Sequence, residues 1–199
     1  MKLFGNVKNK FDKETNIVDG NNCLNECNFK KALKYFDKGL KIDSKDPRLW
    51  NNKGLALEGL KKFDKACGCF DKALKIDPGY VKAWYNKGLA LTKSKKYQEA
   101  LKCFDKALEL DPTYVDAWNY KGISLGSIKN YQEAFKCFDK ALELAPQNFH
   151  VWYSKGLILA KNRKVQEAIE HFDKALELKP DFEPAKESKK LLKAIHRIP

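Results

Sequence analysis

The chain has 199 residues, with 39 lysines and arginines against 26 aspartates and glutamates, which gives a formal net charge of +13. This length accommodates one domain or a short repeat array and excludes a complex multidomain enzyme. The hydrophobic fraction of 43% excludes a disordered chain, and only 7 prolines and 11 glycines argue against an all-β fold, which needs frequent turns. A folded helical protein is therefore expected.

The first eight residues contain no apolar core of signal-peptide length, and no later stretch approaches the roughly 20 apolar residues that a membrane span needs. We therefore expect a cytoplasmic protein that does not enter a membrane. Cysteines in a reducing compartment remain thiols, and the paired spacings typical of zinc sites do not occur here. The cysteines in question are Cys23, Cys27, Cys67, Cys69, Cys103 and Cys137. No metal and no cofactor are expected.

An internal repeat of 34 residues runs through most of the chain. Tryptophan recurs at this interval, at Trp50, Trp84, Trp118 and Trp152, and a glycine follows each tryptophan by four residues. Alanine, phenylalanine and proline recur at the same step later in each unit. Four full units therefore span 47–80, 81–114, 115–148 and 149–182. A degenerate first unit spans 13–46, in which Asn16 replaces the tryptophan and Ser44 the proline.

Each unit predicts two helices joined by a short turn. In the unit 47–80, apolar residues recur every three or four positions, first around Trp50 and then from Phe63 to Leu74. Pro78 lacks an amide donor and ends the second helix. A glycine inside a helix costs about 1 kcal/mol relative to alanine, so Gly54 needs a packing reason. We expect that reason to be close contact between the two helices.

The landmarks of the unit 81–114 are Trp84, Gly88, Ala100, Phe104 and Pro112. This pattern resembles the tetratricopeptide repeat, and the resemblance covers about 170 residues. It implies an all-α fold, a right-handed superhelical solenoid of antiparallel helix pairs, with the first helix of each pair lining a concave groove. The chain would hold five repeats, the first of them degenerate, between a short N-terminal arm or weak cap (1–12) and a C-terminal capping helix (183–199).

No catalytic constellation stands out, so we expect a non-enzymatic protein. The three histidines form no hydrolase triad, and no phosphate-binding glycine loop or zinc-binding helix is present. Cys69, Cys103 and Cys137 share one repeat position, which places them roughly 8–10 Å or more apart, too far for a disulfide. We interpret them as buried small hydrophobic residues, and the recurring Asp-Lys pairs, such as Asp71-Lys72, as a solvated outer face.

The resemblance also implies which residues line the concave groove. Counting from the first residue of each unit, the family turns positions 2, 5, 6, 9, 12 and 13 of the first helix toward the concave side. Arg48 with Asn52, and Lys82 with Asn86, are each four residues apart and share a helix face. Cations beside amides suit a carboxylate or an extended peptide backbone. The candidate groove residues are Arg48, Asn52, Leu55, Lys82, Tyr85, Asn86, Leu89, Asn119, Tyr120 and Ile123.

Chaperone-binding members of the family clamp a terminal carboxylate with a fuller set of lysines and asparagines than this chain has. We carry over only the role of the position 6 asparagines, with the Leu and Ile row at position 9 as apolar anchors. Residues 1–114 hold +9 of the net charge. The sequence thus predicts an interaction scaffold for an acidic or carboxylate-bearing protein or peptide ligand.

Two alternatives remain open. One is nucleic-acid binding through basic turns and the tail, although no stripe of interleaved aromatic and basic residues supports it. Its candidate contacts are Lys61, Lys62, Lys65, Lys93, Lys95, Lys96, Lys189, Lys190 and Lys193. The other is self-association through the cap helix.

Overall fold

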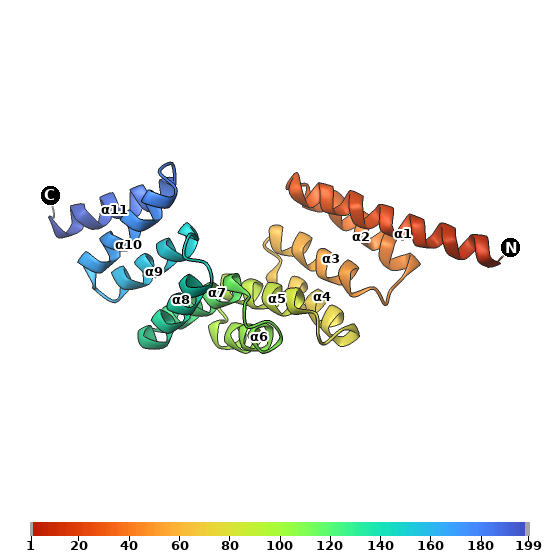
Figure 1. Cartoon of the computed structure of the whole chain (residues 1–199). Coiled ribbons are helices and arrows are strands. Elements are labelled where there is room, and N and C mark those ends of the chain that lie inside the picture. Colours follow the sequence, from red (N-terminus) through yellow and green to blue (C-terminus); the bar gives the residue numbers. More distant parts are fainter. Residues whose placement is uncertain (1, 198–199) are drawn as a thin grey trace. The chain divides into compact units, whose positions relative to one another are not determined.

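The computed structural model describes the backbone of residues 2–197 and the side chains of residues 9–197. All regular structure in this part of the chain is helical, which confirms the all-α class, and the helices follow one another in antiparallel pairs (Figure 1). The helices are α1 (Lys2–Asn25), α2 (Phe29–Ile42), α3 (Pro47–Gly59), α4 (Phe63–Ile76), α5 (Val81–Lys93), α6 (Tyr97–Leu110), α7 (Val115–Ser127), α8 (Tyr131–Leu144), α9 (Phe149–Lys161), α10 (Val165–Leu178) and α11 (Glu183–His196).

The chain divides into two compact units. The amino-terminal unit, Met1–Leu110, holds α1 to α6, and the carboxy-terminal unit, Asp111–Pro199, holds α7 to α11. The residues expected to form an N-terminal arm or weak cap, 1–12, are helical from Lys2 onward and continue without a break into the first helix of the degenerate repeat. Each unit is described by itself below.

A glycine and a phenylalanine hold each helix pair together. A Cβ atom on Gly54 would lie 2.5 Å from the ring of Phe70, and one on Gly88 would lie 2.6 Å from that of Phe104. Both rings are completely buried. No side chain larger than hydrogen fits at these positions, so the expected packing reason for the helical glycines is confirmed.

The turn inside each pair contains a residue with left-handed backbone. Lys61 has φ of 58°, and its amide donates to the carbonyl of Glu58 at 2.8 Å while the Lys62 amide donates to that of Leu57 at 2.9 Å. These two bonds form a Schellman motif, which satisfies carbonyls at the end of the helix. The same conformation recurs every 34 residues, at Cys27, Lys61, Lys95, Lys129, Arg163 and Arg197. The sequence did not predict it, because none of these residues is glycine.

Neighbouring repeats are joined by the tryptophans. The indole nitrogen of Trp84 donates to the carbonyl oxygen of Pro78 at 2.9 Å, in the turn that links α4 to α5. The other three tryptophans make the same bond to the carbonyls of Ser44, Pro112 and Pro146. The half-buried indole therefore fixes the turn between repeats as well as filling space.

Most of the recurring aspartates on the second helices are exposed, as expected, but several of them also pair with the following first helix. Lys87 Nζ lies 2.6 Å from Asp71 Oδ1, which joins α5 to α4. The same pair recurs between Lys53 and Asp37, between Lys155 and Asp139, and between Lys189 and Asp173. The interpretation of these aspartates as a purely solvated face was therefore incomplete, since four of them pair with a lysine sixteen residues later in the chain.

The first and the last described helices carry polar residues at repeat positions that are buried or tightly packed in the other helices. At repeat positions 3 and 10, Leu49 and Ala56 are completely buried, whereas Thr15 and Asn22 at the same positions of α1 are exposed. At the other end, α11 begins 34 residues after α9 and stops at the left-handed Arg197, so it is the first helix of a sixth repeat. Lys190 takes the glycine position there, which suits a helix that caps the array.

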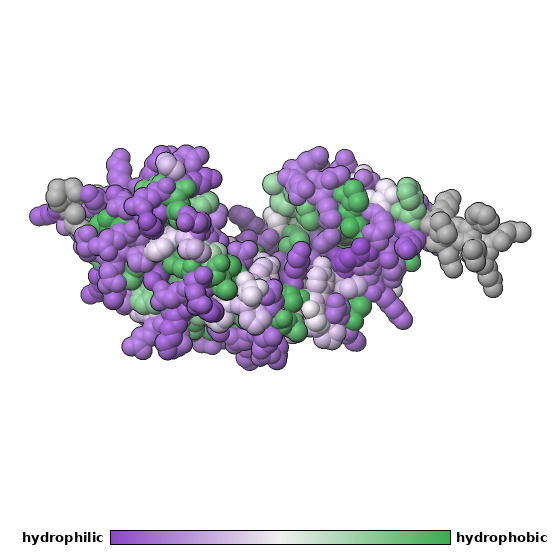
Figure 2. Space-filling view, viewed as in Figure 1, coloured by the Kyte–Doolittle hydropathy of each residue, from purple (hydrophilic) through white to green (hydrophobic). Residues whose placement is uncertain are grey.

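The described helices include none that is both long and apolar enough to cross a membrane. All six cysteines are free, and Cys69, Cys103 and Cys137 are buried, as expected. Hydrophobic residues form small patches on an otherwise hydrophilic surface, as the face in Figure 2 shows.

Candidate functional site

The predicted groove residues are divided between the two units. Seven of them lie on α3 and α5 of the amino-terminal unit, and α3 packs beside α5. The other three lie on α7, the first helix of the carboxy-terminal unit. The structure therefore brings together Arg48, Asn52, Leu55, Lys82, Tyr85, Asn86 and Leu89, while Asn119, Tyr120 and Ile123 form a separate set.

The guanidinium group of Arg48 already forms ion pairs with carboxylates of its own chain. Its Nη2 lies 2.6 Å from Asp46 Oδ2 and 2.6 Å from Glu14 Oε1, and its Nε donates to Asp46 Oδ1 at 3.1 Å. Lys13 adds an ion pair of 3.1 Å to Asp46 and one of 2.9 Å to Asp43. This cluster ties α1 to the turn before α3. The side-by-side pair of available cations expected at Arg48 and Lys82 is thus reduced to one.

The cluster also shifts the pKa values of its members. The hydrogen bond from Arg48 lowers the pKa of Glu14 below its ordinary value. Burial by itself would raise the pKa of Asp46, but the hydrogen bonds from Arg48 and Lys13 outweigh burial and lower it. Asp46 also caps α3, because its Oδ1 accepts from the Arg48 amide at 2.9 Å. These contacts therefore favour the charged form of Glu14 and Asp46.

Lys82 is the available cation on this face. Its side chain is exposed, and it makes no ion pair with any residue that the structure describes. It occupies the same repeat position as Glu14 and Arg48, two repeats after Glu14 and one repeat after Arg48. An incoming carboxylate can therefore bind Lys82 without displacing an internal partner.

Four asparagine side chains form a chain of hydrogen bonds across α1, α3 and α5, which we call the amide network. Asn86 Nδ2 donates to Asn51 Oδ1 at 2.9 Å, and Asn51 Nδ2 donates to Asn52 Oδ1 at 3.1 Å. Asn52 Nδ2 then donates to Asn21 Oδ1 at 2.8 Å. Asn51 is only 3% exposed and connects the two predicted residues. Sequence reasoning did not select Asn51 or Asn21 as site residues, although the adjacent asparagines 51 and 52 were a visible signal.

The apolar members of the predicted groove also contribute to the core. Leu55 packs against the buried cluster around Phe70, and the ring of Tyr85 lies 6.3 Å from that of Phe104. Both side chains are half-buried, as is Leu89. They can offer an edge to a ligand while most of their surface stabilises the repeats.

Asn119 is the counterpart of Asn51 in the carboxy-terminal unit, but its environment differs. It is 6% exposed, and its Oδ1 is a buried acceptor with no hydrogen-bond partner among the described residues. The residue 35 positions later, equivalent to Asn86, is Ser154, which is also buried. Its shorter side chain makes no such bond, so the amide network of the amino-terminal unit has no equivalent here.

Aromatic residues occupy the next first helix of this unit. The ring of Tyr153 lies 5.1 Å from that of Phe182, and its hydroxyl lies 3.3 Å from Ser188 Oγ. Phe149 packs edge to face on Phe182 at 5.0 Å. These contacts join α9 to the start of α11. Tyr120 and Ile123 on α7 are half-buried.

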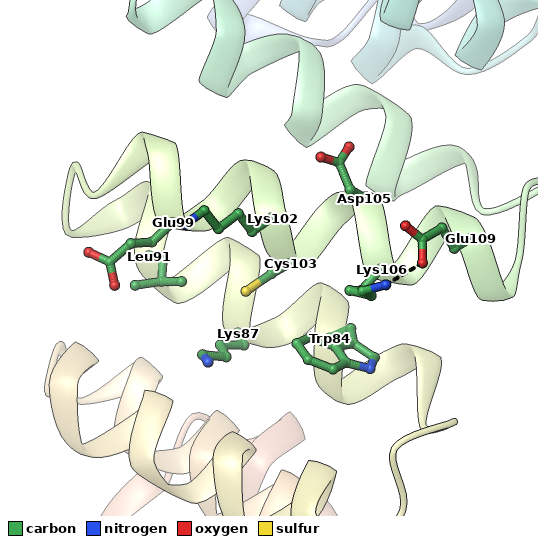
Figure 3. A pocket seen from close by; sticks show the side chains of 9 residues that line it. All are labelled: Trp84, Lys87, Leu91, Glu99, Lys102, Cys103, Asp105, Lys106 and Glu109. Atoms are coloured by element: carbon green, nitrogen blue, oxygen red, sulfur yellow. Dashed lines mark hydrogen bonds and ion pairs between the residues drawn. The ribbon is translucent and has the colours of Figure 1, made fainter.

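A cleft of about 600 Å³ lies on the other side of α5, between α5 and α6 (Figure 3). With 3.6 residues per turn, its α5 residues at repeat positions 4, 7 and 11 point away from the groove positions. Two of its lysines are paired within the chain, Lys87 with Asp71 and Lys106 with Glu109 at 2.6 Å each. Burial raises the pKa of the Cys103 thiol to about 11, so this thiol remains protonated at neutral pH. The lining residues are Trp84, Lys87, Leu91, Glu99, Lys102, Cys103, Asp105, Lys106 and Glu109.

An equivalent cleft of about 470 Å³ recurs one repeat later, around Trp118 and Cys137. A cavity that recurs at equivalent positions of successive repeats is a product of the repeat architecture. We therefore place the candidate site on the groove side.

The lysines of the nucleic-acid alternative are also partly engaged. Lys96 pairs with Asp64 at 2.8 Å, and Lys93 and Lys189 pair with Glu58 and Asp173. At least three of the nine candidate contacts are therefore already neutralised within the chain.

Comparison with known families matches the repeats directly. A family described as "Tetratricopeptide repeat" matches residues 47–80, 81–114, 115–148 and 150–182. These matches cover more than half of the chain, so the protein belongs to the tetratricopeptide repeat family.

Several solved structures resemble the chain. MamA from Desulfovibrio magneticus RS-1 is 25% identical, with a TM-score of 0.74 over 86% of this chain and 97% of that one. YrrB, described as a TPR protein with an unusual peptide-binding site, is 26% identical, with a TM-score of 0.67 over 88% and 90% of the two chains. PilF from Pseudomonas aeruginosa is 20% identical, with a TM-score of 0.80 over 96% and 87%, and shows the fold alone. A comparison with curated protein sequences finds no significant match.

Proposed function

We propose that this protein is a non-enzymatic interaction scaffold whose amino-terminal unit binds an acidic or carboxylate-bearing peptide segment along α1, α3 and α5. The observation that carries this proposal is the amide network beside the exposed Lys82. Family membership supports an interaction role in general, and the description of YrrB as a peptide-binding protein supports a peptide as the ligand.

The amide network suits a peptide backbone because each amide retains bonding capacity. An asparagine side chain has two N–H donors and an oxygen that accepts two bonds. Asn52 and Asn86 each use one donor inside the network. The remaining donors and acceptors match the alternating C=O and N–H groups of an extended peptide, and their orientation is fixed before the ligand arrives, which lowers the entropy cost of binding.

The charged residues divide into two roles in this proposal. Lys82 contacts a ligand carboxylate directly, whereas Arg48 is a positioning residue that holds Glu14 and Asp46. The net charge of +9 over residues 1–114 attracts acidic ligands over a longer range. On the carboxy-terminal unit, Asn119, Tyr120 and Ile123 remain candidate contacts, although the Oδ1 of Asn119 is itself buried.

The proposal is tested with fluorescein-labelled decapeptides that carry zero, two or four glutamates among glycine and serine, each with a free or an amidated carboxy terminus. Fluorescence anisotropy should show affinity that rises with the number of carboxylates. Lys82→Glu should weaken binding about tenfold. The matched control is Lys75→Glu, an exposed lysine on α4 whose replacement changes the net charge equally, and it should change affinity less than twofold.

Equal effects of Lys82→Glu and Lys75→Glu on peptide affinity would contradict the proposed binding site at Lys82. A duplex DNA oligonucleotide serves as the competing probe. If it binds more tightly than any peptide, ignores Lys82→Glu, and weakens with salt by a slope of about −0.9 per neutralised phosphate, nucleic acid is the ligand and the proposal is wrong.

A further inference from the structure

Two carboxylates in different surroundings hold the guanidinium group of Arg48. Asp46 is buried, with only 5% of its side chain exposed, and it accepts from Nε and Nη2 of Arg48. Glu14 lies at the surface, with 43% of its side chain exposed, and it accepts from Nη1 at 3.2 Å and from Nη2 at 2.6 Å. Arg48 is thus bound on one edge by a buried carboxylate and on the other edge by an exposed one.

The contact between Glu14 and Arg48 has the geometry with which arginine binds a carboxylate ligand. The two oxygens of Glu14 meet the two terminal nitrogens of Arg48, which is the bidentate arrangement that makes arginine selective for carboxylates. Asp46 holds the same guanidinium group from its Nε side, so the terminal edge keeps its direction when Glu14 moves away. A ligand carboxylate can then form the same two hydrogen bonds.

The charge balance of the cluster does not depend on Glu14. Lys13 and Arg48 supply two positive charges, and Asp43 and Asp46 supply two negative charges. Glu14 adds a third negative charge and pairs with no described residue other than Arg48. An ion pair between exposed side chains shifts an equilibrium by no more than about fivefold. Exchange of Glu14 for a ligand carboxylate therefore costs little and leaves the buried charge of Asp46 paired.

Lys82 is the equivalent residue of the repeat that follows Arg48. Glu14, Arg48 and Lys82 occupy position 2 of three successive first helices, and α3 packs beside both α1 and α5. The ion pair between Glu14 and Arg48 shows that long side chains at this position reach across one repeat. When Glu14 moves away, Arg48 and Lys82 present two cations one repeat apart, an arrangement that suits a segment with two carboxylates.

We propose that Glu14 is an internal competitor for Arg48, which an acidic peptide segment displaces when two of its carboxylates bind Arg48 and Lys82 together. The inference rests on the proposed function, because it concerns the same groove, and it adds a resting state in which Glu14 covers one of the two cations. The terminal edge of Arg48 recognises the carboxylate group alone. The ligand carboxylate therefore comes from an acidic side chain or from a free carboxy terminus.

The experiment uses the full chain and the labelled four-glutamate decapeptide, with a free and with an amidated carboxy terminus. In fluorescence anisotropy, Glu14→Ala should raise the affinity for at least one of the two forms about threefold to fivefold, because Arg48 no longer has an internal competitor. The matched control is Asp19→Ala, which removes the same charge from α1 five residues later and thus from another face of the helix. It should change affinity by less than about 1.5-fold, since charges away from the site are screened.

The part played by Arg48 is isolated by the double variant Glu14→Ala, Arg48→Gln. Glu14→Ala should not raise affinity in the Arg48→Gln background, because no guanidinium group remains to be released. Circular dichroism of each variant checks that the helices are intact, since Arg48 also contacts Asp46 at the start of α3. Three results would overturn the inference: no increase with either form of the peptide, an increase in the Arg48→Gln background, or an equal increase with Asp19→Ala.

The peptides also identify the source of the carboxylate and separate the two proposals. An increase with the free terminus alone assigns the terminal carboxylate to Arg48, and an increase with both forms assigns a glutamate side chain. An equal increase with the amidated peptide that has no glutamate would contradict carboxylate exchange. If Lys82→Glu weakens binding about tenfold while Glu14→Ala changes nothing, only this inference is wrong, whereas no effect of Lys82→Glu contradicts the proposed function itself.

Discussion

The two units of this protein present different chemistry from equivalent repeat positions. In the amino-terminal unit, Asn51 and its neighbours form a continuous amide network and leave Lys82 available for a ligand. In the carboxy-terminal unit, Asn119 has an unpartnered oxygen, and exposed leucine and isoleucine line a cleft. The repeat therefore sets where a side chain points, while a few substitutions decide what it can bind.

The largest expected effect comes from disrupting the contact between glycine and phenylalanine inside each helix pair, which both units share. Gly88→Val places branched carbons where a Cβ alone would lie 2.6 Å from the Phe104 ring, and overpacking of this kind should lower the free energy of unfolding by about 3 kcal/mol. Gly156→Val should do the same in the carboxy-terminal unit, where Phe172 is 2.7 Å away. Urea denaturation measures both variants.

The control for this prediction is Gly68→Ala. A Cβ on Gly68, which is exposed within α4, would meet no atom within 4 Å, so alanine should raise stability by about 1 kcal/mol through helix propensity. A loss of stability at Gly68 would show that helical glycines matter here for some reason other than contact with phenylalanine.

The next largest effect on stability should differ between the two units, because it depends on the buried asparagines Asn51 and Asn119. Asn51→Leu leaves a donor on Asn86 and an acceptor on Asn52 without partners, and it should cost about 2 kcal/mol in urea denaturation. Asn119→Leu removes a buried oxygen that has no donor, so it should be neutral or stabilising. Ser154→Asn should restore the missing donor and add about 1 kcal/mol. Equal losses at Asn51 and Asn119 would contradict the difference between the units.

A smaller effect depends on pH and is confined to the amino-terminal unit. The pKa values of Glu14, Asp43 and Asp46 are lowered in the folded state, so their contribution to stability is present above the ordinary carboxyl pKa values and is lost as pH falls through the lowered ones. Arg48→Gln should remove about 1 kcal/mol at pH 7 and less at pH 3. Melting temperatures measured from pH 7 to pH 3 should therefore converge for the two proteins, and parallel curves would argue against the cluster.

The smallest expected effect concerns the turns. Lys61→Gly relieves a left-handed backbone conformation that disfavours side chains, and it should raise stability by about 0.5–1 kcal/mol after the entropy cost of glycine in the unfolded chain is subtracted. Arg163→Gly should match it in the carboxy-terminal unit. Thermal unfolding compares the two with Lys65→Gly, which places glycine at an exposed position inside α4 and should lose stability.

The candidate site could be located from the sequence only in part. The repeat placed Asn52 and Asn86 on the same face as Lys82, because helical residues four apart share a face. It could not reveal that Arg48 is held by Glu14, since that contact joins residues 34 apart on separate helices. The roles of Asn21 and Asn51 were missed for the same reason. The exposure of Leu191 could not be predicted from the sequence either, because apolar residues at helical spacing usually indicate a buried core.

The sequence by itself determined the repeat, the helix pairs and the family, because those features depend on local periodicity and on a glycine that only close packing explains. Tertiary structure decided which charges are available and which amides are connected, since these depend on side chains from different repeats meeting in space. It also decided the left-handed turns at Lys61 and its equivalents, where hydrogen bonds that satisfy helix-end carbonyls outweigh the backbone preference of lysine.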